Sequence, residues 1–354
     1  MIGFALVGCG RIARRHADIL AGGQVEGANL VGVCDIDGER ARAFGERHGV
    51  PWFTDFDAMM IELADRVHVV SVLTPSGMHA RHTIALAAYG KHIVVEKPMA
   101  LTLADADAMI RACDLAGVKL FVVKQNRYNL PVRKLREAVE AGRFGKIVLA
   151  TVRVRWCRTQ EYYDQDAWRG TWAQDGGVFS NQASHHVDLL EWMVGDVDSV
   201  FAKSATALVD IEAEDTGVVV VKFRNGALGV IEATTATRPV DLEGSISILG
   251  EYGSVEIGGF AVNQMKVWNF SHRLPEDDLV LSGFRENPPN VYGFGHARYL
   301  QHVVECVVRG SPALVDGLEG RKSLELISAI YESIETGREV ALRFAPRHAR
   351  LGRG

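Results

Sequence analysis

The first third of the chain alternates between short apolar runs and stretches in which apolar residues recur every three or four positions. The apolar runs are rich in β-branched residues and stop at polar residues or proline, which is typical of buried strands. The predicted strands are Phe4–Val7, Leu30–Cys34, Val67–Leu73, Ile93–Val95 and Lys119–Val123. The predicted helices include Gly38–His48, His79–Tyr89 and Leu103–Ala116. This alternation predicts an α/β domain built on a doubly wound parallel sheet.

From Ile147 onward the pattern changes to longer strands with turn signals such as Arg224-Asn225-Gly226 between them. These strands are Ile147–Val154, Val200–Ala207, Thr216–Phe223 and Ala227–Thr234. They predict an α+β domain with a large, mostly antiparallel open sheet. Because 354 residues exceed the size at which a single core stops growing, we predict two domains, residues 1–124 and 125–354.

The segment Gly176–Leu190 lies between the first two long strands and contains two adjacent histidines. The positions that share one face of a predicted helix are Val178, Ala183, Val187 and Leu190. His185 and Asp188 are then one turn apart. Spacing alone does not decide between His185 and His186, and a single helical histidine is more often structural than catalytic.

Composition narrows the class of protein. A net charge of −5 with 23% charged residues argues against a nucleic-acid partner. Five cysteines lie far apart without a Cys-x-x-Cys pair, so we expect neither disulfides nor a metal site. No apolar run reaches the ~18 residues of a membrane span, and the chain begins directly with a predicted strand. We therefore expect a cytoplasmic protein with no membrane partner.

The first strand leads into Gly8-Cys9-Gly10-Arg11-Ile12-Ala13, which opens a helix. In a Gly-x-Gly-x-x-Ala turn, Gly8 permits the tight turn and Gly10 lets the backbone approach a pyrophosphate. The N–H groups at the start of the helix then bind the phosphates. A plain tight turn is the alternative, but the strand before the motif and the helix after it predict a dinucleotide-binding Rossmann domain.

Asp35 ends the second strand, 35 − 8 = 27 positions after the first glycine of the motif. Its carboxylate can accept a hydrogen bond from a ribose 2′-hydroxyl and would repel a 2′-phosphate, which favours NAD over NADP. The alternative is that Asp35 merely caps the helix that follows.

The strand Ile93–Val95 stops at Glu96-Lys97-Pro98. Ligands of open parallel sheets bind outside the carboxyl ends of the strands, so Lys97 is a candidate for chemistry. The alternative is that Glu96 and Lys97 open a solvated loop. The predicted cofactor contacts are Gly8, Gly10, Arg11, Ile12, Asp35, Thr74, Pro75, Glu96 and Lys97.

Three motifs together resemble those of the Gfo/Idh/MocA oxidoreductases: Gly8-x-Gly10-x-x-Ala13, Glu96-Lys97-Pro98 and Asn181-x-x-x-His185-x-x-Asp188. The resemblance covers nearly the whole chain. It implies a Rossmann domain followed by an antiparallel-sheet domain, NAD(P)-dependent oxidation or reduction of a sugar-like alcohol, and assembly through the open sheet. It also implies catalytic roles for Lys97 and His185.

Longer stretches are similar to one group within that family, the WlbA-type UDP-N-acetyl-2-amino-2-deoxyglucuronate dehydrogenases. These stretches are residues 122–127, 160–165, 168–172, 181–185 and 292–296. The similarity implies oxidation of the 3-hydroxyl of UDP-N-acetylglucosaminuronic acid (UDP-GlcNAcA) by NAD+, before an aminotransferase acts, in bacterial surface-polysaccharide (lipopolysaccharide) synthesis.

The chain departs from the family at Asn181, where many members have aspartate. An amide can orient an imidazole but cannot stabilise its cation by charge. Lys97, in a desolvated crevice beside a positive nicotinamide, would lose its proton more easily. We therefore predict that Lys97 removes the hydroxyl proton and that His185 orients the hydroxyl.

A substrate with a diphosphate and a carboxylate needs local cations in a chain of negative net charge. The candidates are Arg127, Arg155, Arg158 and Arg169, each of which could instead be a solvated sheet-face arginine. Tyr162, Tyr163 and Trp172 are candidates for stacking on the uracil ring, with core packing as the alternative for Trp172. The predicted substrate contacts are Lys97, Asn126, Arg127, Arg158, Tyr163, Arg169, Asn181 and His185.

Two other functions are compatible with the same fold. One is an NAD-dependent enzyme of another sugar or inositol, including a glycosidase that oxidises C3 transiently; the other is an NAD-binding regulator without turnover. The sequence leaves open whether NADH is released or is reoxidised in place by a 2-oxo acid. The long strands offer few helices to cover both sheet faces, so we expect a homo-oligomer, either a tetramer or a dimer.

Overall fold

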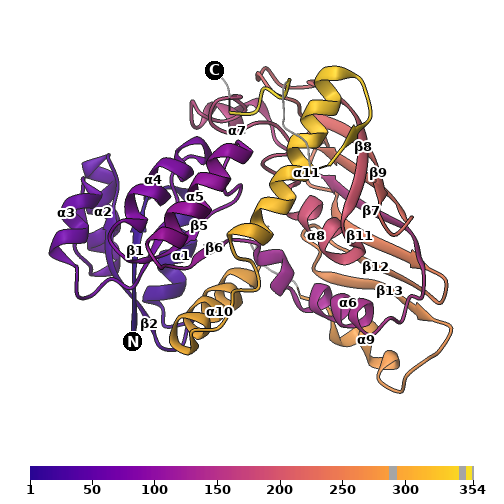
Figure 1. Cartoon of the computed structure of the whole chain (residues 1–354), viewed down its shortest axis with the longest axis horizontal. Helices are drawn as coiled ribbons and strands as arrows, with labels where there is room; N and C mark the ends of the chain where they lie inside the picture. Colours follow the sequence, from indigo (N-terminus) through magenta and orange to yellow (C-terminus); the bar gives the residue numbers. More distant parts are fainter. Residues whose placement is uncertain (287–292, 343–347, 353–354) are drawn as a thin grey trace. The chain divides into compact units, whose positions relative to one another are not determined.

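The computed structural model describes residues 1–286, 293–342 and 348–352. The chain forms two compact units, of which the first contains residues 1–124 and 296–321 and the second residues 125–295 and 322–354 (Figure 1). The sequence predicts a single crossing after Lys124. The structure corrects that prediction, because residues 296–321 return to the first unit.

The first unit is built on six parallel strands in the order β3-β2-β1-β4-β5-β6. The strands are β1 (Ile2–Val7), β2 (Ala28–Cys34), β3 (Trp52–Phe53), β4 (Val69–Val72), β5 (His92–Val95) and β6 (Leu120–Val122). The helices between them are α1 (Arg11–Ala21), α2 (Gly38–His48), α3 (Phe56–Glu62), the 3-10 turn η1 (Ser76–Met78), α4 (His79–Ala87) and α5 (Leu103–Leu115). The predicted doubly wound sheet is confirmed, and its order reverses between β1 and β4, where such sheets bind ligands.

The segment that returns to the first unit covers the edge of its sheet beside β6. The N–H of Val122 donates to the carbonyl of Val315 over 3.1 Å, and Phe121 forms an isolated antiparallel bridge with Asp316. The helices in this part of the chain are α10 (Gly295–Arg309) and α11 (Gly317–Thr336). These contacts pair backbone groups that the edge strand β6 would otherwise expose. Because they join residues far apart in the sequence, local patterns did not reveal that the chain returns to the first unit.

The second unit contains eight strands in the order β13-β12-β11-β7-β10-β9-β8-β14. All paired neighbours run antiparallel except β7 and β10, so the predicted mostly antiparallel sheet is confirmed. The strands are β7 (Ile147–Arg155), β8 (Val197–Ala205), β9 (Thr216–Phe223), β10 (Leu228–Thr234), β11 (Glu243–Gly250), β12 (Gly253–Gly258), β13 (Gln264–Phe270) and β14 (Val340–Ala341). The helical elements are η2 (Gln125–Tyr128), α6 (Leu130–Glu140), α7 (Gln160–Asp164), α8 (Ser184–Val194) and α9 (Asp277–Gly283).

One face of this sheet is covered and the other is open. Helices α6 and α8 pack against the covered face, and Ser333 of α11 accepts the backbone N–H of Ala202 in β8 (Figure 1). Along β9 the side chains alternate, with Val219 and Val221 fully buried while Val218 and Val220 are about half exposed. The sheet therefore presents an apolar surface on its open face.

Candidate active site

The glycine turn after β1 matches a dinucleotide cradle in its geometry. Gly8 has φ +98°, and a Cβ there would lie 2.8 Å from the carbonyl carbon of Leu73. A Cβ on Gly10 would meet nothing within 4 Å, so the space beside this turn is open. Helix α1 begins with Arg11 and Ile12, and no side chain caps its N–H groups. Helices α2, α3 and α5 are each capped by a side chain. The uncapped N–H groups of α1 are thus suited to a phosphate.

Asp35 follows β2 and faces the glycine turn. Its carboxylate is 8% exposed and accepts the backbone N–H groups of Cys9 (2.7 Å) and Asp37 (2.9 Å). The N-cap of α2 is Asp37, which accepts the N–H groups of Glu39 and Arg40, so the alternative in which Asp35 caps this helix is not found. Each carboxylate oxygen has a second lone pair, which leaves Asp35 able to accept a ribose hydroxyl.

Thr74, Pro75 and Lys97 lie at the carboxyl ends of β4 and β5, at the same edge of the sheet as the glycine turn. A residue that the sequence did not reveal, His79, joins these loops. Its Nδ1 is 2.8 Å from the carbonyl oxygen of Pro98, and its Nε2 is 2.8 Å from that of Thr74. The loop after Lys97 and the loop after β4 are therefore tied through one buried ring.

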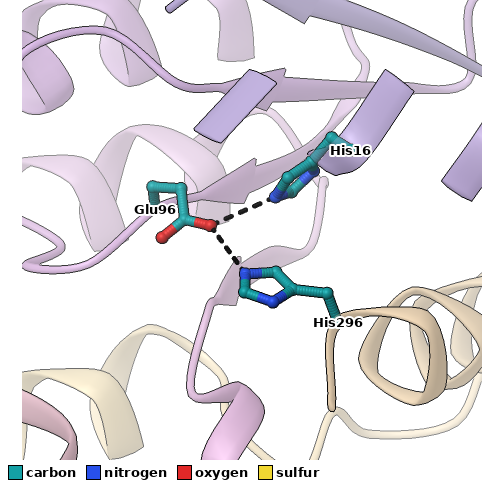
Figure 2. A group of neighbouring side chains, drawn as sticks. All are labelled: His16, Glu96 and His296. Carbon is teal, nitrogen blue, oxygen red and sulfur yellow. Dashed lines mark hydrogen bonds and ion pairs between the residues drawn. The ribbon is translucent and has the colours of Figure 1, made fainter. Parts of the chain in front are cut away.

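The carboxylate of Glu96 forms its hydrogen bonds with residues of the first unit. Its Oε1 lies 3.1 Å from Nε2 of His16 and 3.3 Å from Nε2 of His296 (Figure 2). Its Oε2 accepts the N–H of Lys97 over 3.1 Å. The residue is only 5% exposed. The carboxylate therefore serves three groups of its own unit, and the contact of Glu96 with the cofactor stays a prediction.

In the second unit, helix α8 begins at Ser184, so the prediction that Val178 belongs to its face is wrong. The N–H of Val178 donates to the carbonyl of Glu214, and the N–H of Phe179 donates to the Glu214 carboxylate. These bonds to Glu214 replace helical ones. A Cβ on Gly177 would lie 2.2 Å from the Glu214 carboxylate, so glycine is required there.

The two adjacent histidines have different surroundings. His185 Nε2 lies 2.9 Å from the side-chain amide nitrogen of Gln125. His186 is fully buried, packs edge-on against Trp156 at 5.9 Å, and its pKa is lowered to about 4 by burial. His186 therefore belongs to the core, and His185 stays the predicted functional histidine.

The polar residues around His185 are engaged with other partners. Asn181 donates to Asp175 over 2.6 Å. Asp188 binds Arg127 through two bonds of 2.8 Å, both side chains being at most 3% exposed, and the Arg127 guanidinium lies 4.7 Å from the Trp192 ring. This guanidinium therefore fixes helix α8 to the segment after β6, and its predicted substrate role stays a prediction.

The other predicted arginines each have a carboxylate partner. Arg155 pairs with Glu232 and Glu243, Arg158 with Asp241, and Arg169 with Asp166. Arg158 and Arg169 also flank the Tyr162 ring, at 5.4 and 4.7 Å from its centroid, and Arg169 donates to the Tyr162 hydroxyl. Two cations of the predicted substrate set, Arg158 and Arg169, therefore share one aromatic ring.

The remaining predicted contacts are largely buried. Tyr163 is 5% exposed, its hydroxyl lies 3.1 Å from that of Thr235, and burial raises its pKa to about 12. Its substrate contact stays a prediction. Trp172 packs edge-on against Tyr331 at 5.3 Å, in agreement with core packing. Asn126 lines a hollow of the second unit together with Asn129, Ala261, Asn263, Glu286, Gly293 and Phe294. Tyr292 of the motif at 292–296 lies outside the described residues.

Comparison with known proteins agrees with this architecture in both units. Residues 2–124 match the oxidoreductase family's NAD-binding Rossmann fold, and residues 136–342 match its C-terminal alpha/beta domain. The chain belongs to the Gfo/Idh/MocA oxidoreductase family. It is an oxidoreductase whose cofactor is NAD, as the sequence predicts. Within the described residues, no helix has both the length and the apolar character needed to cross a membrane.

Several family members are similar to this chain over nearly its whole length. The WlbA dehydrogenase of Bordetella pertussis, solved with NADH and UDP-GlcNAcA, is 44% identical with a TM-score of 0.88, covering 97% of this chain and 99% of that one. The WlbA dehydrogenase of Chromobacterium violaceum, solved with the same ligands, is 45% identical with a TM-score of 0.90, covering 97% and 96%. Myo-inositol 2-dehydrogenase of Thermotoga maritima is 29% identical, covering 95% of this chain and 97% of that protein.

Proposed function

We propose that this enzyme oxidises the 3-hydroxyl of UDP-GlcNAcA to a ketone with NAD+, and that its product feeds surface-polysaccharide synthesis. The observation that carries the proposal is the identity of 44–45%, over 97% of the chain, with two dehydrogenases solved with NADH and UDP-GlcNAcA. Identity to the inositol dehydrogenase is 29%. The sugar nucleotide is therefore the first substrate to test.

The first unit contains the groups that would hold the cofactor. The open space at Gly10 and the uncapped N–H groups of α1 suit the pyrophosphate, and the Asp35 carboxylate suits a ribose hydroxyl. When bound, NAD+ supplies the acceptor for the hydride from the sugar carbon. We assign Thr74 and Pro75, at the end of β4, to the same site.

Lys97 and His185 divide the proton chemistry in this proposal. Lys97 stands at the end of β5 and removes the proton of the sugar hydroxyl. His185 is held by Gln125 and orients that hydroxyl. Asn181 and Asp188 bond to Asp175 and Arg127, so we assign both of them to support of the segment around His185.

We assign the anionic groups of the substrate to Arg158 and Arg169, which share Tyr162. A guanidinium can bind a second oxyanion beside its carboxylate partner because it carries five N–H donors in a fork. The aromatic ring holds both guanidinium groups in place through cation–π contacts. This leaves Arg155, bound by two glutamates on the sheet, outside the proposed site.

The second candidate is an inositol dehydrogenase, which the Thermotoga maritima relative favours. Membership in an oxidoreductase family sets aside the NAD-binding regulator. The two enzymatic candidates differ in the charge of the substrate, because inositol has neither a phosphate nor a carboxylate.

The test is a comparison of kcat/KM for UDP-GlcNAcA, UDP-N-acetylglucosamine and myo-inositol, recorded as NADH absorbance. Loss of one charge-assisted hydrogen bond costs roughly 1.5–3 kcal/mol, so the uronate should react at least about tenfold faster than the uncharged sugar nucleotide. Adding a 2-oxo acid then shows whether bound NADH is reoxidised in place. Equal or faster turnover of myo-inositol would favour the second candidate.

A further inference from the structure

Three buried side chains of the first unit meet where β5 ends. His16 comes from the second turn of α1, Glu96 directly follows β5, and His296 lies in the first turn of α10 (Figure 2). Their side chains are 0%, 7% and 1% exposed. The two rings cross edge-on with centroids 5.6 Å apart, and both point at the same oxygen of Glu96.

We refer to His16, Glu96 and His296 together as the clamp. Burial and hydrogen bonding determine the charges of its side chains. Burial alone would raise the pKa of Glu96, but the hydrogen bonds from His16 and His296 outweigh it and hold that pKa well below its usual range. Burial lowers the pKa of His16. The clamp therefore contains an ionised carboxylate that accepts N–H bonds from its neighbours, including a neutral His16.

Two histidines and a carboxylate also form a common metal-binding set, but the bonding here favours a hydrogen-bonded clamp. Metal-ligating histidines almost always donate their second ring N–H to an acceptor. Nδ1 of His16 is buried and has no hydrogen-bond partner among the described residues. The Nε2 positions, 3.1 and 3.3 Å from Glu96 Oε1, match ordinary hydrogen bonds.

The peptide that carries Lys97 is held on both sides. On one side its N–H donates to Oε2 of Glu96, and on the other His79 lies 2.8 Å from the carbonyl oxygen of Pro98. His16 of the clamp belongs to helix α1, which begins at the glycine turn. One carboxylate thus connects the backbone of Lys97 to the helix that binds the cofactor phosphates.

We propose that Glu96 is a positioning residue for Lys97, acting through its bonds to His16, His296 and the Lys97 backbone. This inference rests on the proposed role of Lys97 as the base. A base misplaced by about 1 Å can lose roughly 10²-fold in rate, and a lysine side chain with four rotatable bonds depends on a fixed backbone. Glu96→Gln keeps the shape but turns an N–H donor toward the Lys97 N–H or toward a histidine.

The first experiment is a double-mutant cycle on kcat with Glu96→Gln, Lys97→Ala and the double variant. Glu96→Gln should lower kcat about 10- to 100-fold while changing the affinity for NADH by less than about threefold. The double variant should be no slower than Lys97→Ala alone, because a residue that acts through Lys97 has nothing left to position. Multiplying losses in the double variant would overturn the proposal.

His296→Gln provides a second variant, with His302→Gln on the same helix as its control. His302 lies outside the clamp and accepts the N–H of Leu314. We expect His296→Gln to have a lower kcat than the parent enzyme. The control, His302→Gln, should have the same kcat as the parent enzyme. Equal kcat in both variants would contradict the clamp, as would one zinc or iron per chain retained by the parent enzyme after dialysis against a chelator.

A third readout does not depend on the sugar. Acetic anhydride acetylates lysine amines, and peptide mass spectrometry of the NADH-bound enzyme gives the rate at Lys97 relative to the exposed Lys266 in the same sample. That ratio should change at least about threefold in Glu96→Gln and stay constant in His302→Gln. An unchanged ratio in Glu96→Gln would overturn the positioning role, whereas failure of the parent enzyme to oxidise UDP-GlcNAcA would overturn only the proposed substrate.

Discussion

Asp35 and Arg40 bring opposite charges to within 3.8 Å beside the glycine turn. The carboxylate favours ribose hydroxyls, while a nearby arginine could accept a 2′-phosphate once that carboxylate is neutralised. Calorimetric titration should therefore show that NAD binds more than tenfold tighter than NADP, a difference of about 1.4 kcal/mol. Asp35→Asn should lower this ratio of the two affinities. Asp55→Asn is the control, because Asp55 caps α3 through the N–H of Ala58 and should leave the ratio unchanged. Equal affinities of the parent enzyme for both cofactors would contradict the assignment.

Lys97 and His185 can be distinguished by substitution. Removing a general base costs ~10²–10⁴ in kcat, so Lys97→Ala should lose at least that much and His185→Ala somewhat less. Stopped-flow or steady-state rates with UDP-GlcNAcA measure both, and NADH fluorescence checks that the cofactor still binds. Near-native turnover by Lys97→Met together with an inactive His185→Asn would reverse the two roles.

At the scale of elements, the segment before α8 depends on one buried acid. Glu214 accepts the N–H of Phe179 and the hydroxyl of Tyr331, which in turn accepts the N–H groups of Gly177 and Ser180. Burial raises the pKa of Glu214 to about 7. Burial therefore outweighs the hydrogen bonds to the carboxylate and favours the neutral acid below about pH 7, beside the segment just upstream of Asn181 and His185.

Stability should follow the titration of Glu214. Its folded pKa lies above its unfolded value, so the folded chain binds more protons between about pH 4.5 and 7, and this contribution is lost as pH rises through that window. The shift corresponds to on the order of 3 kcal/mol. The free energy of unfolding, measured with urea across this window, should depend less on pH in Glu214→Gln than in the parent. The nearby variant Glu212→Gln is the control and should keep the pH dependence of the parent. The same slope in Glu214→Gln and the parent would contradict the raised pKa.

The sequence predicted elements well where the information is local. The glycine turn, the strands around it and the bounds of α2 and β9 follow from periodicity and turn residues, and the structure has them at those positions. Helix α8 was predicted to start too early because Val178 and Phe179 give their N–H groups to Glu214, about 35 residues away. Periodicity carries no information about such a partner.

The candidate site was less predictable for the same reason. Strand ends and motif spacing singled out Lys97 and Asp35, and the family resemblance singled out His185. The sequence could not show that Arg127 is neutralised by Asp188, 61 residues away, or that Tyr163 packs against Thr235. Histidines such as His16 and His79 carry no local signal, because a buried ring at helical spacing resembles any core residue.

For the whole molecule, the open face of the eight-stranded sheet predicts assembly. Val218 and Val220 of β9 and Leu228 of the neighbouring β10 are each about half exposed on this face, an apolar surface of the kind that marks an interface. Light scattering should show a homo-oligomer at micromolar concentration. Val218→Lys with Val220→Lys should shift it toward smaller species, because like charges on that surface repel their copies. A parent enzyme that remains monomeric would contradict this prediction.

The 200 positions between Glu96 and His296 also bear on how the protein is made. At ≈ 5–20 residues per second, a ribosome releases Glu96 roughly 10–40 s before it releases His296. During that time the nascent nucleotide-binding unit has its glycine turn and His16 but lacks one donor to a carboxylate destined for burial. A polypeptide terminated before residue 296 would contain the complete dinucleotide fingerprint and still leave that charge short of a partner. The end of β5 therefore reaches its final bonding only after residue 296 has been synthesised.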